Sequence, residues 1–248
     1  MKILSIGNSF SQDAQRYFAN FAKAAGDEIE THNLYIGGCP LVKHWNNYVA
    51  DEKAYSHEVN GVSTGDMISI SEALSLRDWD YITLQQVSHH AGLPETFEPY
   101  LGNLITVIRT VCPNAQIAFH ETWEYEYCSE HGGFPIYDKN CDKMCEAIKS
   151  ACHAAAKEYD LLLIPSGEVI HEVKKTPEFD SEHGGQSLYR DAFHMHLVYG
   201  RYLLACIWYK TLLKKSPVGC SFLPTDGEVK EELLPILQKA ANSFVLKP

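Results

Sequence analysis

The sequence predicts an α/β fold, a three-layer α/β/α sandwich built around a five-stranded parallel sheet. Short apolar runs alternate with amphipathic stretches along the chain, which is the pattern of a parallel sheet wrapped by helices. The chain has 248 residues, of which 45% are hydrophobic, and this is enough for one sizeable core. No repeat, linker or low-complexity tract divides it. We therefore expect a single domain over residues 1–248.

Five short apolar runs are expected to form the strands of this sheet. They lie at residues 2–6, 28–36, 81–85, 115–120 and 161–164. A sixth feature stands outside the main alternation, because Asn60-Gly61 is a strong turn signal between two short β-prone runs. We expect a hairpin within residues 55–70.

The amphipathic stretches between these runs are expected to be helices. They cover residues 12–25, 41–50, 71–77, 98–111, 139–158, a segment starting near Ser166, 197–213 and 226–243. In open sheets of this kind, ligands bind beyond the carboxyl ends of the strands. Functional residues are therefore expected at 7–11, 37–44, 85–92, 120–136 and in the loop that precedes residue 197.

Composition argues against several classes of function. A formal net charge of −11 opposes binding to nucleic acid or to an anionic membrane surface. The apolar run after Met1 and Lys2 is too short for a secretory signal, and no stretch is long enough to span a bilayer. The eight cysteines form no CxxC pair, and Cys141, Cys145 and Cys152 lack an evident fourth zinc ligand. We expect reduced thiols, a cytoplasmic location and no metal or other cofactor.

The segment Gly7-Asn8-Ser9-Phe10-Ser11 follows the first expected strand directly. Gly7 is expected to let the chain turn sharply, because glycine adopts backbone dihedral angles closed to other residues. Ser9 then begins a helix, where free amides and the helix dipole favour a developing negative charge. The alternative is that Ser9 or Ser11 only caps the helix.

The pair Asp191 and His194 gives that serine two partners. On a turn, a carboxylate three residues before an imidazole can hold one ring nitrogen while the other faces outward. The alternative is a turn aspartate beside a surface histidine. Position favours the first interpretation, because the fold brings this late loop beside the loop after the first strand. His196 has no acid at the same spacing and ranks second as a base.

Histidine-rich segments leave open a metal-dependent hydrolase as an alternative. The pattern His194-Met195-His196 is the best argument for metal binding, and further ligand-type residues lie on loops: His89, His90, His120, Glu121, His131 and His183. They form no coherent ligand set with the spacing of a known metal motif. We therefore expect no metal.

Four segments together resemble the SGNH (GDSL-like) hydrolase superfamily. They are ILSIGNSFS at 3–11, YIGGCPL at 35–41, WDYITLQQVS at 79–88 and RDAFHMHLVYGRYL at 190–203, in the right order along the whole chain. The closer resemblance is to an uncharacterised bacterial branch whose first strand is followed by GNSF. It implies a flavodoxin-like SGNH hydrolase fold and a serine esterase with an acyl-enzyme. Ser9 would be the nucleophile, His194 the general base and Asp191 the residue that orients it.

The resemblance also implies an oxyanion hole, the set of donors that binds the charged oxygen of the transition state. The backbone amides of Ser9 and Gly38, the latter beside Gly37, match two of its donors. The superfamily places an Asn side chain third, but this chain has Gln85-Gln86 after the third strand. Glutamine carries the same amide, so we nominate Gln86, with Gln85 and Ser88 as alternatives.

The expected substrate is a small-molecule or carbohydrate ester with a small acyl group, acetyl above all, because neighbouring SGNH branches deacetylate carbohydrates. Trp123, Tyr125 and Tyr127 alternate with acidic residues in a loop that can overhang the site, which suits a sugar. Packing of this loop onto the core is the alternative. The missing Asn also leaves open a catalytically inactive carbohydrate-binding protein of the same fold.

Overall fold

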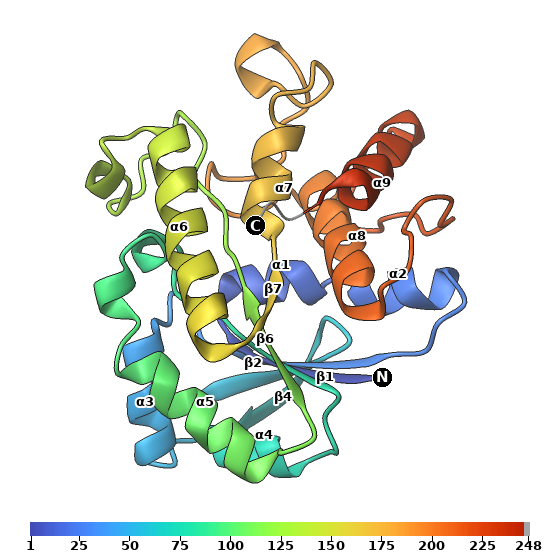
Figure 1. Cartoon of the computed structure of the whole chain (residues 1–248). Helices are drawn as coiled ribbons and strands as arrows, with labels where there is room; N and C mark the ends of the chain where they lie inside the picture. Colours follow the sequence, from blue (N-terminus) through green and yellow to red (C-terminus); the bar gives the residue numbers. More distant parts are fainter. Residues whose placement is uncertain (246–248) are drawn as a thin grey trace.

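The computed structural model, which describes residues 1–245, places the five predicted strands in one sheet. They are β1 (Lys2–Gly7), β2 (Glu30–Tyr35), β5 (Tyr81–Leu84), β6 (Gln116–His120) and β7 (Leu162–Ile164). All neighbouring pairs among them are parallel, in the spatial order β2-β1-β5-β6-β7. The sheet runs through the middle of the molecule (Figure 1). The predicted α/β class is confirmed.

Within residues 1–245 the sheet has seven strands, so the predicted number of five is wrong. The two additional strands are β3 (Tyr55–Val59) and β4 (Val62–Ile68), the two arms of the predicted hairpin. Its turn residues, Asn60 and Gly61, have φ angles of 50° and 74°, as a tight two-residue hairpin requires. Strand β3 pairs antiparallel with β2, because the free edge of β2 offers backbone groups that need partners.

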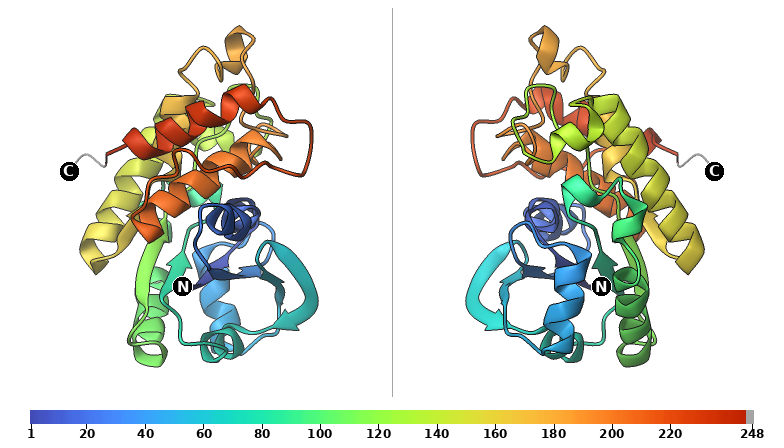
Figure 2. Two further views of the ribbon diagram at one scale, coloured as in Figure 1. Left: turned by 90° about the vertical axis from the view of Figure 1, so that its right-hand side faces the viewer. Right: turned by 90° about the vertical axis from the view of Figure 1, so that its left-hand side faces the viewer.

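Helices cover both faces of the sheet. They are α1 (Ser9–Gln15), α2 (Phe18–Ala24), α3 (Leu41–Val49), α4 (Ile70–Ser75), α5 (Tyr100–Val111), α6 (Cys141–Tyr159), α7 (Ser166–Val173), α8 (Tyr199–Leu213) and α9 (Leu234–Ser243). Helices α1, α2 and α8 lie on one side, and α3, α4 and α5 lie on the other (Figure 2). Within residues 1–245, no helix has the length and apolar character that a bilayer span requires.

Two predicted helices differ from the structure. The stretch expected as one helix over 12–25 begins at Ser9 and is interrupted between α1 and α2, at Arg16 and Tyr17. Both residues bond Asp226, whose backbone amide donates to the Tyr17 hydroxyl. Asp226 itself was expected in a helix starting at 226, but the last helix starts at Leu234. Tertiary hydrogen bonds thus outweigh local helix propensity in both places.

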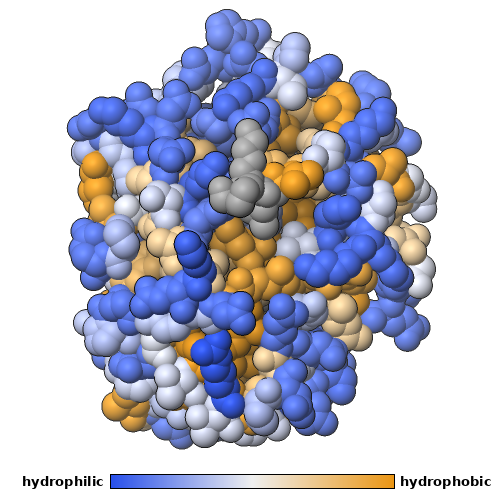
Figure 3. Space-filling model, viewed as in Figure 1, coloured by the Kyte–Doolittle hydropathy of each residue, from blue (hydrophilic) through white to orange (hydrophobic). Residues whose placement is uncertain are grey.

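The face of the molecule drawn in Figure 3 is hollowed, with apolar surface near its centre and polar side chains around it. A cavity of about 930 Å³ lies between α6, α7 and α9, lined among others by Cys145, Glu168, His171 and Phe244.

The candidate site lies elsewhere, at the carboxyl edge of the sheet. The carboxyl ends of the parallel strands meet at one edge of the sheet, where the loops after β1, β2, β5 and β6 converge.

Candidate active site

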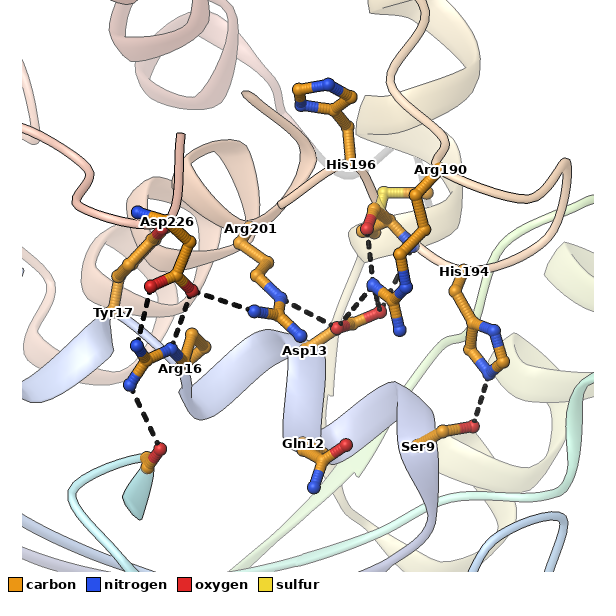
Figure 4. Close-up of polar contacts among 12 residues, drawn as sticks. Ser9, Gln12, Asp13, Arg16, Tyr17, Arg190, His194, His196, Arg201 and Asp226 are labelled. Carbon is orange, nitrogen blue, oxygen red and sulfur yellow. Dashed lines mark hydrogen bonds and ion pairs between the residues drawn. The ribbon is translucent and has the colours of Figure 1, made fainter. Parts of the chain in front are cut away.

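Ser9, His194 and Asp191 form a hydrogen-bonded trio at this edge. The Ser9 hydroxyl oxygen lies 2.8 Å from His194 Nε2, and His194 Nδ1 lies 2.7 Å from Asp191 Oδ2. Ser9 is the first residue of α1, and the other two lie in the loop before α8, 182 and 185 residues away. Figure 4 shows His194 reaching toward Ser9 across the gap between these segments. The three residues nominated from the sequence are thus brought together.

Asn8, which the sequence argument overlooked, leaves the Ser9 hydroxyl free for this contact. Asn8 is the N-cap of α1, and its side-chain oxygen accepts a hydrogen bond of 3.0 Å from the Phe10 amide. The Ser11 hydroxyl is buried and lies 2.7 Å from the side-chain oxygen of Asn33. The interpretation of Ser9 or Ser11 as a simple cap is therefore wrong. The preference of Asn for N-cap positions was the available signal.

Gly7 is required for space and not for an unusual dihedral angle. It is not among the glycines with positive φ, so the expected reason for a glycine here is wrong. A Cβ atom at this position would lie 2.3 Å from the Ser11 hydroxyl oxygen, which is closer than real Cβ contacts. Close packing of the strand end against α1 therefore excludes any larger residue.

Asp191 shapes the turn that presents His194. Its Oδ1 accepts hydrogen bonds from the backbone amides of Phe193 (3.3 Å) and His194 (2.7 Å), while Oδ2 binds the ring. Between them, Ala192 has a φ of 66°, in the left-handed region that non-glycine residues seldom adopt. The local sequence alone does not mark a site, because Asp180 and His183 repeat the spacing and the 2.7 Å contact. What distinguishes His194 is its contact with Ser9.

Hydrogen bonds from His194 favour the ionised form of the Asp191 carboxylate. Burial tends to raise the pKa of Asp191, but hydrogen bonds from the ring and the backbone amide of His194 outweigh it and hold the pKa below its usual value. An ionised carboxylate accepts the proton of Nδ1, which leaves the lone pair of Nε2 directed at Ser9. In this arrangement His194 can take the hydroxyl proton of Ser9.

The aromatic segment after β6 packs against this turn and supports it. Trp123 Nε1 donates to the Phe193 carbonyl at 2.8 Å, and the Trp123 ring stacks on Phe10 with centroids 4.2 Å apart. Trp123 and Tyr125 are both 0% exposed. The expectation that these two rings offer a face to a sugar is therefore wrong, and the alternative of packing onto the core holds. Tyr127 is half exposed.

Gln86 does not have a free amide for an oxyanion. Its Nε2 lies 3.1 Å from both the carbonyl and the hydroxyl oxygen of Thr96, and its Oε1 accepts from the Leu41 and Val87 amides. The nomination of Gln86 as third donor is thus not supported, because the side chain ties three loop segments together. The alternative Ser88 has its hydroxyl 2.7 Å from that of Tyr125.

Gln85 belongs to a buried hydrogen-bond chain beneath the nucleophile. Its Nε2 donates to Asn8 Oδ1 at 2.7 Å, and its Oε1 lies 3.0 Å from His120 Nδ1. His120 Nε2 in turn lies 3.0 Å from the Ser166 hydroxyl. Burial lowers the pKa of His120 to about 3, so the ring is neutral and donates one proton, to Gln85. The chain orients Asn8 and hence the start of α1.

The backbone amides of Ser9 and Gly38 are the two donors expected from the sequence for the oxyanion hole. Asn8 Nδ2 donates to the Cys39 carbonyl at 3.1 Å, which ties the Gly37-Gly38 turn to the start of α1. Gly38 has a φ of 62°, and no atom lies within 4 Å of the Cβ it lacks. In the described part of the chain, the amides of Ser9 and Gly38 have no hydrogen-bond acceptor. Both can therefore donate to a ligand.

His196 does not join His194 in a pair of metal ligands. Its Nδ1 accepts a hydrogen bond of 3.2 Å from the Val198 amide, and its ring stacks on Tyr199. Burial, followed by the positive charge of Arg190, lowers its pKa. Both ring nitrogens of His194 are already engaged in the trio. The two histidines therefore do not form a metal site together.

Ligand-type side chains also gather near α6 and α7. Two groups lie there: Glu121 with His153 and Glu168, and Glu124 with Cys145 and His171. In each group a lysine ammonium already neutralises a carboxylate, Lys149 on Glu168 at 2.8 Å and Lys174 on Glu124 at 2.9 Å. Neither group contains a member of the trio, and we assign no metal to them.

Comparison with known proteins places the chain in a family. Residues 2–242 match the family described as Domain of unknown function (DUF4886). The structure of a DUF4886 family protein from Bacteroides uniformis is 31% identical and superposes with a TM-score of 0.89, covering 98% of this chain and 93% of that one. This chain belongs to the DUF4886 family.

The DUF4886 chain also shares its fold with more distant proteins. A candidate SGNH hydrolase from Slackia heliotrinireducens is 20% identical, with a TM-score of 0.59 over 86% of this chain and 98% of that one. A catalytic mutant of an acetylxylan esterase from Geobacillus stearothermophilus is 14% identical, with a TM-score of 0.52 over 85% and 93%. A search of curated proteins gave no match. The predicted resemblance to SGNH hydrolases is confirmed for the fold.

Proposed function

We propose that this protein is a serine esterase that hydrolyses a small acyl ester through an acyl-enzyme. One observation carries the proposal: the Ser9 hydroxyl oxygen lies 2.8 Å from His194 Nε2, while His194 Nδ1 lies 2.7 Å from Asp191. A nucleophile, a base and an acid that orients the base are the three groups that acyl transfer requires. All three are in hydrogen-bonding contact without any movement of the chain.

In the proposed reaction, Ser9 Oγ attacks the ester carbonyl and His194 Nε2 takes its proton. Asp191 stabilises the imidazolium that forms. When the tetrahedral intermediate collapses, the C–O bond to the alcohol breaks and His194 returns the proton to the leaving oxygen. Water then attacks the acyl-Ser9 ester with the same base, and the acid is released. The sequence of steps needs no cofactor.

The proposed oxyanion site consists of the Ser9 and Gly38 amides. The Ser9 amide belongs to the nucleophile itself, and the Gly37-Gly38 turn is tied to the start of α1 by the Asn8–Cys39 hydrogen bond. Both amides lack an acceptor in the described part of the chain. Backbone donors aimed at the developing oxyanion are often the largest single contribution to acyl-transfer catalysis. Gln86 is assigned a supporting role, because its amide holds Thr96 and the Leu41 amide.

For the substrate we propose an acetyl ester, with the alcohol supplied by a carbohydrate or another small polyol. The fold shared with an acetylxylan esterase supports this choice by analogy. Three neighbouring rings, those of His131, Phe193 and the base His194, offer a contact surface for the alcohol. Their centroids are 4.9 Å apart between His131 and Phe193, and 4.0 Å apart between Phe193 and His194. These rings replace Trp123 and Tyr125 as the surface proposed for the alcohol.

Fluorophosphonate labelling with peptide mapping tests the proposal directly. The expected result is labelling at Ser9, and loss of both labelling and p-nitrophenyl acetate hydrolysis in Ser9→Ala. Ser75→Ala is the control, because Ser75 of α4 is exposed and its hydroxyl donates to the Ser71 carbonyl at 3.1 Å, outside the hydrogen-bond chain beneath the nucleophile. This control should label and turn over like the wild type.

Other outcomes identify the alternative functions. Turnover that survives Ser9→Ala but is lost with a chelator would indicate a metal-dependent hydrolase. Glycan binding without fluorophosphonate labelling of the wild type would indicate a binding protein that keeps the fold. Either result overturns the esterase proposal.

A further inference from the structure

A buried carboxylate connects the nucleophile's helix to the loop that carries the base. Asp13 lies four residues after Ser9 on α1, so both side chains project from the same face of the helix. Asp13 is 0% exposed and its Oδ2 accepts a hydrogen bond of 3.0 Å from the backbone amide of Met195, the residue after His194. Figure 4 shows Ser9 and Asp13 meeting this loop at two points, one helical turn apart.

The same carboxylate also holds the other end of the turn. Arg190, the residue before Asp191, places its NH1 2.9 Å and 3.0 Å from the two oxygens of Asp13. NH1 of Arg190 also bonds the Met195 carbonyl, and the Arg190 amide donates to the His194 carbonyl at 3.0 Å. Asp13 therefore contacts the residues that flank the Asp191–His194 turn on both sides.

Arg201 of α8 completes the surroundings of Asp13. Its Nε donates to Asp13 Oδ1 at 2.9 Å, so that each oxygen of the carboxylate accepts two hydrogen bonds. A buried carboxylate with all its acceptor positions filled is fixed in orientation. Arg201 also contacts Asp226 at 2.9 Å, and Asp226 binds Arg16, the residue that follows α1. The ion pairs thus link α1, the loop and α8.

We infer that Asp13 is a positioning residue, which sets the distance and angle at which His194 meets Ser9. The inference rests on the proposed esterase function. Asp13 touches neither Ser9 nor the ring of His194, so it acts only through the turn. Its role is to remove freedom of that turn, whose Asp191 carboxylate is itself 41% exposed and whose ring is 19% exposed. A turn this open to solvent needs a fixed point in the core.

The test compares Asp13→Asn with Asp226→Asn. The Asn amide would face arginine donors and lose at least one acceptor position, which loosens the turn. Asp13→Asn is expected to lower kcat for p-nitrophenyl acetate about 100-fold, the size of effect that a misplaced catalytic group causes, with KM nearly unchanged. Hydrogen exchange within residues 190–196 should become faster. Asp226→Asn weakens two ion pairs of the same network, those with Arg16 and Arg201, but leaves Asp13 on the turn, so both readouts should stay near wild type.

Arg190→Gln provides a second variant, because Arg190 is 26% exposed and its loss leaves Asp13 paired with Arg201. It should lower kcat about 10-fold and loosen the same segment. Wild-type kcat in either folded variant, or an equal loss of kcat in Asp226→Asn, would overturn the inference.

If the wild type reacts with neither ester nor fluorophosphonate, the esterase proposal fails. The exchange experiment still decides on Asp13, because unchanged protection in both variants shows that it does not hold the turn.

Discussion

Substitution of Asp191 gives the sharpest test of the proposed chemistry. Its carboxylate accepts the Nδ1 proton of His194 at 2.7 Å and the backbone amide of the same residue at 2.7 Å. Asp191→Ala removes the charge that stabilises the imidazolium. Asp191→Asn removes the charge and also places an amide group against the ring. The two variants therefore separate electrostatic stabilisation from control of the tautomer.

The electrostatic contribution follows from the geometry. Unit charges about 4 Å apart attract by about 4 kcal/mol at an effective dielectric constant of about 20, and by about 1 kcal/mol in water. The Asp191 side chain is 41% exposed, so solvent screening places this pair between the two limits. A loss of about 2–3 kcal/mol corresponds to a fall in kcat of about 30- to 150-fold in Asp191→Ala.

Asp191→Asn is expected to lose more. The Asn oxygen can keep the backbone amide of His194, which turns the NH₂ group toward Nδ1. Nδ1 must then accept, so the ring proton moves to Nε2 and the base can no longer take the proton of Ser9. For triads of this kind the wrong tautomer costs about 10⁴-fold in kcat. The carboxylate that Asp191→Asn removes is ionised between about pH 6 and 9, because the pKa of Asp191 lies below its usual value.

The assay is p-nitrophenyl acetate hydrolysis, with thermal unfolding as the check on folding. Asp180→Asn is the matched control, since Asp180 contacts His183 at the same spacing and at 2.7 Å, and the His183 side chain is 79% exposed. This control should match the wild type. If folded Asp191→Asn keeps more than about a third of wild-type kcat, the assignment of Asp191 as the residue that orients the base is refuted.

Two further predictions concern stability. Burial, and next the nearby Glu168, raise the pKa of Glu121 well above its usual value, and its Oε2 has no hydrogen-bond partner within residues 1–245, with His153 Nε2 3.9 Å away. The ionised form of Glu121 is penalised only in the folded state, so Glu121→Gln should raise the melting temperature at pH 8 by about 2–4 °C. This gain should fade toward pH 5, where the wild-type carboxyl is protonated more easily. A lower melting temperature of the variant at pH 8 would contradict the prediction. Burial lowers the pKa of His44 and of His120 to about 3, so the unfolded chain takes up protons first as the pH falls below about 6.5. Urea unfolding should therefore give about 2 kcal/mol less stability per histidine at pH 5 than at pH 8, and equal stability at both would count against buried, neutral rings.

The residues of the trio were accessible to sequence reasoning because each lies in a short, recognisable pattern. Ser9 follows the first strand in Gly-Asn-Ser, and Asp191 and His194 share one turn. The order of strands and helices then predicts which loops meet at the carboxyl edge of the sheet. The hairpin was predictable from Asn60-Gly61 as a local turn. Its attachment to β2 was not, because the pairing partner is chosen by the free edge of an assembled sheet.

The third oxyanion donor could not be predicted from the sequence. Gln86 carries the right chemical group at the right place in the chain, but Thr96 and Leu41 use that group. Trp123 and Tyr125 likewise carry the rings that a sugar site needs, yet both are fully buried. Whether an amide or a ring is free depends on what packs against it. That is a property of contacts between segments distant in the sequence.

The sequence by itself determined the fold class and the parallel strands, because these follow from local periodicity and from the order of elements. It nominated the three residues that meet at the candidate site through short motifs and their resemblance to SGNH hydrolases. Only the tertiary structure decided what holds them. Asp13 is one polar residue in an amphipathic helix, and its partners lie 177 to 188 residues further along the chain. A buried carboxylate obtains its hydrogen bonds from whatever the folded core brings near, and no short-range pattern records that choice.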